Sequence, residues 1–127
     1  MHLHAVAIVI PDYDSAIEFY VGKLGFALIH DTRLSDTKRW VLVSPDNSAQ
    51  TKILLAKADG PDQDAAIGSQ TGGRVGFFLH TDDFDATYER MLEARVHFEE
   101  TPRTEIYGKV VVWQDPWGNR WDLLQLV

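Results

Sequence analysis

The sequence contains no cysteine. It can therefore form no disulfide and no thiolate metal site, which fits a reducing compartment, and we expect a cytoplasmic protein. No apolar run approaches the roughly 20 residues that a helix needs to cross a membrane. The opening residues, Met1 to His4, have no basic region leading into an apolar core, so they do not predict a secretory signal. The sequence thus predicts neither a disulfide scaffold nor a membrane protein.

Basic residues are also scarce. There are 12 lysines and arginines against 19 acidic residues, the net charge is −7, and no basic stripe is present. We therefore expect no nucleic-acid partner, whereas a cationic small molecule is electrostatically favoured. A chain of 127 residues, 45% of them hydrophobic, is long enough to bury a core, and we expect a single domain over residues 1–127.

The first half of the chain predicts a β-α-β-β-β order. Residues 3–10 are a continuous apolar run, which is typical of a buried strand. Asp12 and the residues after it offer N-cap oxygens to a helix that extends to about Leu24 and is closed by Gly25. Further strands are expected at residues 26–34, 39–44 and 51–57.

The second half repeats this order. Residues 58–73 are rich in chain breakers, so we expect them to connect two modules, 1–57 and 74–127, rather than to fold. A strand is expected at 75–80, and a helix follows that begins at Asp83 or Asp85. The apolar face of that helix carries Phe84, Tyr88, Met91 and Leu92. The remaining strands are expected at 96–99, 109–113 and 120–126.

An internal duplication underlies the repeat. The pattern at residues 12–18 recurs at 83–89, which is 71 residues later, and the pattern at 53–55 recurs at 121–123, which is 68 residues later. A single module of about sixty residues is marginally able to cover its own sheet. We therefore predict an α+β fold in which two repeated β-α-β-β-β modules form a curled mixed sheet.

The last twenty residues predict a β-hairpin. A strand ending at Trp113 is followed by Asp115-Pro116-Trp117-Gly118, which has the residues of a type I turn, and then by a second apolar run. Because side chains alternate along a strand, Asp122 points away from Trp121, which we assign to the helix side. A single carboxylate thus stands on a sheet face among apolar neighbours.

Two stretches resemble the vicinal oxygen chelate superfamily, which includes glyoxalase I, bleomycin-resistance proteins and extradiol dioxygenases. One is residues 115–119 with the strand that carries Asp122, and the other is residues 6–20 with Leu24-Gly25-Phe26 after them. The resemblance implies a concave groove that holds a ligand, and a homodimer. Arg95 stands where the superfamily usually has glycine, so we expect the second helix to end differently from the first.

Metal-dependent members of the superfamily place histidine or glutamate ligands at four equivalent strand positions. The positions that correspond to them here are Ala5, Leu54, Gly76 and Asp122. Only Asp122 has a donor side chain, and one protein ligand does not hold a divalent ion against water. We therefore predict no metal and no other cofactor.

Two alternatives to this prediction stay open. A displaced metal site could use Asp122 with His80 or His4. His80 shares the face of Gly76 but lies roughly 13 Å further along the strand, and His4 points away from the groove unless a bulge intervenes. Asp122 could instead pair with Arg120, in which case the carboxylate is structural.

Three hypotheses follow for function. The first resembles the bleomycin-resistance branch: a metal-free protein that holds an aromatic or cationic compound in an apolar groove. The second is a lyase, isomerase or dioxygenase with a displaced metal site, and the third is a dimer whose groove is filled by its own side chains. We favour the first, which is not an enzyme, and assign no catalytic residue. The candidate ligand-binding residues are Asp122, Arg120, Phe78, His80, Trp40 and Trp113.

Overall fold

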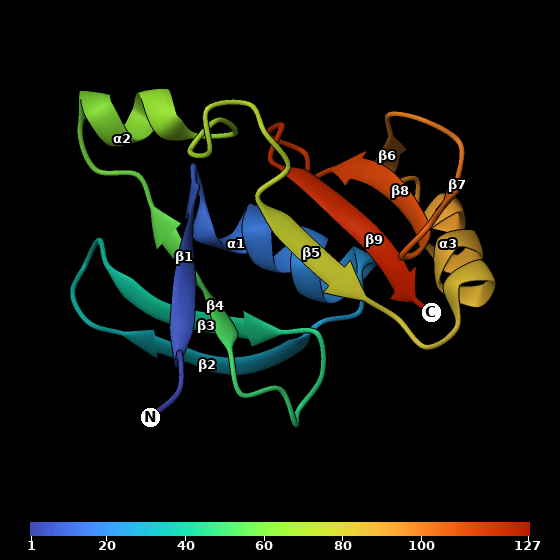
Figure 1. Cartoon of the computed structure of the whole chain (residues 1–127). Coiled ribbons are helices and arrows are strands. Elements are labelled where there is room, and N and C mark those ends of the chain that lie inside the picture. The colour runs from blue at the N-terminus through green and yellow to red at the C-terminus, as the bar shows by residue number, and fades with distance from the viewer. The chain divides into compact units, whose positions relative to one another are not determined.

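The computed structural model describes all 127 residues, which fall into two compact units, Met1–Ile67 and Gly68–Val127. The α+β class and the two repeats are confirmed, and each unit has a hydrogen-bonded sheet of its own (Figure 1). No helix is long and apolar enough to cross a membrane.

The first unit is a four-stranded mixed sheet with strand order β1-β4-β3-β2. β1 runs parallel to β4, whereas β3 is antiparallel to both of its neighbours. The elements are β1 (Ala5–Ile10), α1 (Tyr13–Ile17) with a π-helical continuation (Glu18–Lys23), β2 (Ala27–Arg33), β3 (Arg39–Ser44), β4 (Lys52–Lys57) and α2 (Pro61–Ala66).

The second unit has a five-stranded sheet with order β5-β9-β8-β6, to which β7 adds by pairing with β8. β5 runs parallel to β9, and the other pairs are antiparallel. The elements are β5 (Phe77–His80), α3 (Phe84–Glu93), β6 (His97–Phe98), β7 (Arg103–Glu105), β8 (Gly108–Gln114) and β9 (Arg120–Leu126). The parallel first and last strands are the same in both units, as a duplication requires.

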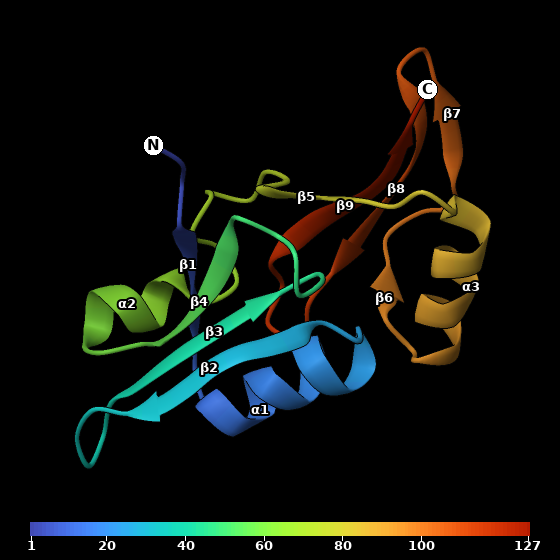
Figure 2. The same cartoon turned by 90° about the horizontal axis from the view of Figure 1, so that it is seen from below.

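Each sheet packs one face on a helix. Figure 2 shows α1 against one side of the first sheet, and α3 contacts β9 in the second. We call the face opposite α1 or α3 the open face of each sheet. The helix-facing positions are buried and apolar because alternate strand residues share a side. In the first unit these residues are Ile8, Ile10, Val41, Val43, Ile53 and Leu55.

Both long helices begin where the sequence predicts an acidic cap. The Asp12 carboxylate accepts a hydrogen bond from Ser15 N at 2.8 Å, and the Asp83 carboxylate accepts one from Ala86 N at 3.2 Å. A side-chain acceptor at this position satisfies a backbone N–H that the helix itself leaves unpaired.

The second helix ends differently from the first in its hydrogen bonds, because the first ends in a π-helical segment and the second stays α-helical, but a left-handed residue follows both. Arg95 adopts a left-handed φ of 62°, as Gly25 does at 81° after the first helix. The Arg95 N–H donates to the Leu92 carbonyl and the Val96 N–H to the Met91 carbonyl, which closes the helix in a Schellman motif. The arginine therefore bears the strain that glycine avoids.

The prediction that residues 58–73 only connect is also wrong, because α2 forms within them. Gly60 takes a φ of 90°, Pro61 occupies the first turn, and Asp62 and Asp64 lie near the N-terminus. Proline and acidic residues both favour the start of a helix. No residue of α2 is buried, so these local signals, and not the burial of an apolar face, explain why the helix forms.

Two details of the second unit differ from the prediction. Leu92, expected on the apolar face of α3, is 45% exposed, whereas Phe84 and Met91 are each 2% exposed. The short strand β7, which no pattern indicated, is polar and pairs with the β8 edge.

Candidate functional site

Asp122 lies on the open face of the second sheet. Its cross-strand neighbours on β5 and β8 are Phe78 and Val112. The adjacent residues Trp121 and Leu123 point the other way and are 3% and 0% exposed. The assignment of Trp121 to the helix side is thus confirmed.

The Asp122 side chain is half-buried and lacks a full set of hydrogen bonds. Its Oδ1 atom is inaccessible to solvent and has no hydrogen-bond partner. Burial raises the pKa of this carboxyl above its ordinary value; Arg103 and Arg120 act to lower the pKa, and Glu100 acts to raise it. A donor group or a cation on a ligand can pair with the carboxylate through its other oxygen, Oδ2, which is not buried in this way.

Arg120 does not form an ion pair with Asp122. Its Nε and Nη2 atoms donate to the two carboxylate oxygens of Glu99 at 2.7 and 2.8 Å. Arg103 is held similarly, because its Nε donates to both oxygens of Glu100 at 3.2 Å. Arg103 Nη1 also donates to Glu105 at 2.5 Å, so Arg120 is paired with one carboxylate and Arg103 with two. This arrangement removes the alternative in which Arg120 neutralises Asp122, and it leaves Asp122 as an unmatched acidic group.

Phe78 and His80 complete this face. Phe78 is 60% exposed directly beside Asp122, and the His80 side chain is 47% exposed beside Leu124. His80 is therefore a diagonal neighbour of Asp122, with its Nδ1 3.9 Å from an Asp82 carboxylate oxygen. The structure thus brings four of the six candidates, Asp122, Arg120, Phe78 and His80, onto one sheet face.

Trp113 does not belong to this face. It is 0% exposed and its ring stacks on that of Trp121, with centroids 4.9 Å apart. Its cross-strand partner is also Trp121, so it lies on the helix side of the sheet. A ligand on the open face does not reach it, and we remove Trp113 from the candidate ligand-binding residues.

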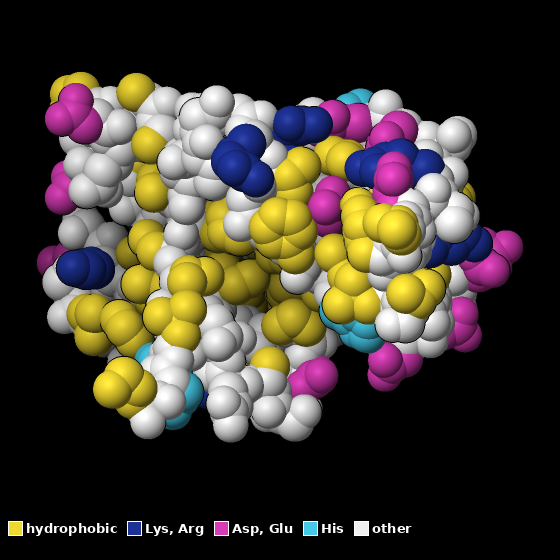
Figure 3. Space-filling view, in the orientation of Figure 1, with side chains coloured by type: hydrophobic (Ala, Val, Ile, Leu, Met, Phe, Trp, Pro, Cys, Tyr) yellow, Lys and Arg dark blue, Asp and Glu magenta, His cyan; other side chains and the backbone are white.

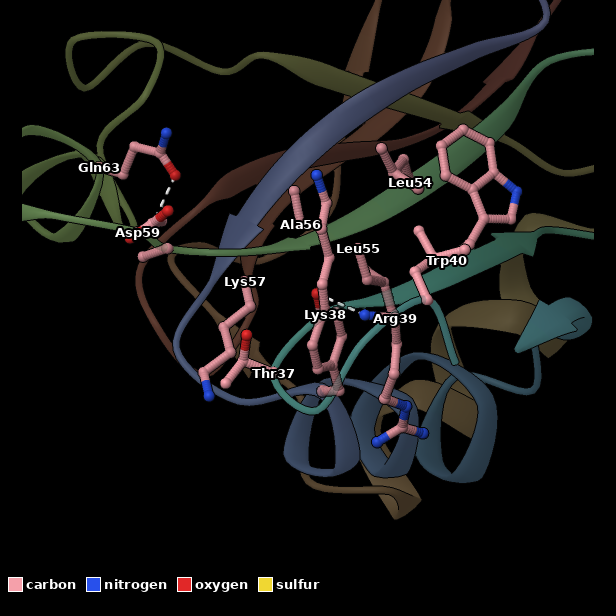
Figure 4. Close-up of a pocket in the computed structure, with 13 residues that line it drawn as sticks. Thr37, Lys38, Arg39, Trp40, Leu54, Leu55, Ala56, Lys57, Asp59 and Gln63 are labelled. Atoms are coloured by element: carbon pink, nitrogen blue, oxygen red, sulfur yellow. Dashed lines mark hydrogen bonds between the residues drawn. The ribbon is translucent and has the colours of Figure 1, made fainter. Parts of the chain in front are cut away.

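Trp40 lies in the first unit, where it lines a cavity of about 660 Å³. A cavity of this size is typical of sites that hold a drug-sized molecule. Figure 4 shows Trp40 next to Leu54 at one end and Gln63 with Asp59 at the other, with Ala56 between them. The indole is 38% exposed. In the view of Figure 3, hydrophobic side chains are exposed over the strands of the first sheet.

Sequence reasoning missed this cavity and Lys38, one of the two lysines that line it. The sequence did contain a signal for the cavity in the spacing of its residues. Lys38 and Trp40 are two residues apart, so their side chains share one face. The same spacing places Leu54, Ala56 and Ala58 on one face. A large ring opposite two alanines leaves space above the strands. The strands alone do not show that α2 closes the far end, since no pattern predicted that helix.

The donor atoms do not fit the metal centre that the resemblance implies. Ala5 and Leu54 have no donor, and at Gly76 even a Cβ atom would lie 2.3 Å from Thr71 Cγ2. No group of three or more histidine, aspartate or glutamate side chains is placed to hold a metal ion. No catalytic step through a metal follows from these residues.

Comparison with known proteins places the chain in a family. The sequence model of the Glyoxalase/Bleomycin resistance protein/Dioxygenase superfamily matches residues 2–123. The chain belongs to this superfamily, in agreement with the duplicated fold.

Individual relatives agree with this assignment. An uncharacterized protein of Shewanella frigidimarina is 51% identical over 122 residues, which cover 95% of this chain and 90% of the relative. A superfamily member from Sphaerobacter thermophilus has a TM-score of 0.80 at 28% identity and covers 98% of this chain and 97% of its own. TnmS3, an antibiotic binding protein from Streptomyces sp. CB03234, has a TM-score of 0.80 at 29% identity and covers 100% and 97%.

Proposed function

We propose that this protein binds a small organic molecule without a metal ion, and that the ligand lies on the open face of the second sheet. One observation carries the proposal: the Asp122 carboxylate, whose inner Oδ1 oxygen is buried and unpaired, lies on the open face beside the exposed ring of Phe78. The protein gives this carboxylate no hydrogen-bond partner at Oδ1, and a donor or cation on a ligand that reaches the other oxygen, Oδ2, stabilises its charge.

The chemistry of the face indicates a cationic compound with an aromatic or apolar body. Asp122 supplies the negative charge, and Phe78 offers a ring face for stacking or for a cation–π contact. The arginines of the face are neutralised by Glu99 and Glu100, so they do not repel a cation. The net charge of −7 also favours the approach of a cation. The antibiotic-binding relative TnmS3 supports a small-molecule ligand.

Calorimetric titration with a matched pair of probes tests this proposal. The amine 2-naphthylmethylamine should bind more tightly than the neutral 2-naphthylmethanol. Asp122→Asn should weaken amine binding about tenfold or more, because a hydrogen bond to a charged group contributes about 1.5–3 kcal/mol. The control Asp82→Asn removes a carboxylate whose side chain is fully exposed, and it should change little. Equal affinity of the amine for the wild type and Asp122→Asn overturns the proposal.

A metal titration tests the metal-free part separately. Chelator-stripped protein is heated with manganese, iron(II), cobalt, nickel or zinc, and we expect no saturable rise in melting temperature. A saturable rise that Asp122→Ala abolishes would instead support the lyase, isomerase or dioxygenase with a displaced site. His80, the diagonal neighbour of Asp122, is the residue to replace next in that case.

We also propose that the protein is a homodimer and that it is located in the cytoplasm. Sedimentation velocity checks the first, since a dimer has twice the 14.4 kDa mass of the chain. Cell fractionation checks the second.

A further inference from the structure

The cavity of the first unit has an apolar floor and an aromatic wall. Leu54 and Ala56 of β4 line it from the open face of the sheet, with Trp40 of β3 beside them, and Leu55 and Tyr13 line it from the helix side. Lys38 lies two residues before Trp40, and Figure 4 shows its side chain extending in the region of Ala56. The alanine leaves room for a flat ring beside the indole.

Three basic side chains line this cavity, but two of them are directed elsewhere. Arg39 donates to Asp31 at 2.7 Å and to Asp14 at 2.8 Å, so two carboxylates neutralise it. Lys57 has the opposite strand parity to Ala56, and its charge helps to lower the pKa of Asp12 at the start of α1. The Lys38 ammonium forms neither an ion pair nor a hydrogen bond.

The single carboxylate among the lining residues lies at the other end. Asp59 is held there through its backbone N–H, which donates to the Gln63 side chain at 2.9 Å. Figure 4 shows Asp59 and Gln63 far from Trp40 along β4, with Lys38 closer to the indole. A group attached to a ring that stacks on Trp40 therefore meets the lysine first.

We propose that this cavity binds a planar aromatic acid, whose ring stacks on Trp40 above Ala56 and whose carboxylate pairs with the Lys38 ammonium. The site is separate from the Asp122 face in its residues and in the charge that it selects, and it goes beyond the function proposed above. Stacking supplies most of the affinity, and the ammonium selects the acid over a neutral compound of the same shape.

The test uses two probes of one shape, 2-naphthoate and 2-naphthamide, titrated by calorimetry at low salt. We expect the acid to bind about threefold more tightly, the ratio that an exposed ion pair typically gives, and the ratio to fall as salt is added. In a ¹⁵N-labelled sample, the indole N–H signal of Trp40, assigned with Trp40→Phe, should shift as the acid binds. Trp40→Ala should weaken both probes about tenfold.

Lys38→Met should bring the affinity of the acid down to that of the amide and leave the amide unchanged. The control Lys52→Met removes a lysine of the same sheet that lies outside the cavity, and it should preserve the ratio. Three results overturn the proposal: equal affinities of acid and amide for the wild type, an unchanged ratio in Lys38→Met, or binding without a shift of the Trp40 signal. Asp122→Asn should leave acid binding intact, so failure at one site is distinguishable from failure at the other.

Discussion

Replacing Asp122 by asparagine should stabilise the protein at neutral pH. The Oδ1 atom of Asp122 is inaccessible to solvent and unpaired, and a buried polar group in that state costs about 1–3 kcal/mol. Asparagine keeps the shape and the unpaired oxygen and puts an NH2 group in place of the other oxygen, so any gain comes from removing the charge alone. We therefore expect a gain of about 1 kcal/mol in the free energy of unfolding, which corresponds to about 4 °C in Tm for a chain of this length.

This gain should depend on pH in a defined direction. Because burial raises the pKa of folded Asp122, the folded protein binds the proton more tightly than the unfolded chain does. The contribution of Asp122 to stability therefore falls as the pH rises through the interval between the unfolded and folded pKa values, and it stays low above that interval. Asparagine has no such proton. The advantage of Asp122→Asn should be full above the raised folded pKa and vanish below the ordinary carboxyl pKa of 3.8.

Urea denaturation at a series of pH values measures this difference. Equal slopes against urea for the two proteins show that the comparison is of stability alone. Asp82→Asn, which changes a fully exposed carboxylate, should match the wild type within about 0.5 kcal/mol. A loss of stability in Asp122→Asn at pH 7 refutes the reasoning, since it means that the fields of Arg103 and Arg120 outweigh the burial of the carboxylate.

Three further predictions concern the backbone and the charged face. Arg95→Gly should raise stability by about 1 kcal/mol in thermal unfolding, because glycine adopts the observed φ of 62° without strain; an unchanged or lower Tm contradicts this. Gly68→Ala should lower the free energy of unfolding by at least about 2 kcal/mol, since a Cβ there would lie 1.8 Å from the Trp117 carbonyl oxygen. The control Gly72→Ala has open space around its Cβ and should lower it by only about 1 kcal/mol. Equal losses for the two variants in urea denaturation contradict the steric argument. Glu99→Gln should lower stability by about 1 kcal/mol at pH 7: a hydrogen-bonded guanidinium lowers the carboxyl's folded pKa, so its contribution is present above the unfolded pKa and is lost as the pH falls through the folded pKa. A deficit that persists in acid contradicts that prediction.

The fold was predictable because its signals are local and occur twice. Asp12 and Asp83 mark the helix starts in both repeats, and both accept the expected backbone hydrogen bond. The turn at Asp115 is confirmed by the Gly118 N–H, which donates to the Asp115 carbonyl at 3.1 Å. The polar residues Arg120 and Asp122 alternate with apolar ones, so the two faces of β9 could be assigned from the sequence.

The position of Trp113 was not predictable in the same way. Val110, Val111, Val112 and Trp113 are all buried, whichever face they occupy. An uninterrupted apolar strand has no polar alternation to show which side meets the helix. The partner Trp121 decides the face only once the register of β8 against β9 is known, and register is a tertiary property.

The open faces of the two sheets share their strand pairing but differ in their side chains. Ala7 lies beside Leu54 in the first sheet, and Phe78 lies beside Asp122 in the second, at equivalent places in the repeat. The strand pairing is the same, yet one pair is apolar and the other combines a ring with a half-buried carboxylate. A lysine lines the cavity of the first unit, so the charges offered to a ligand are opposite in sign. Because so few side chains set this difference, membership of the superfamily does not define the ligand, and the acid and amine probes must be compared on each sheet separately.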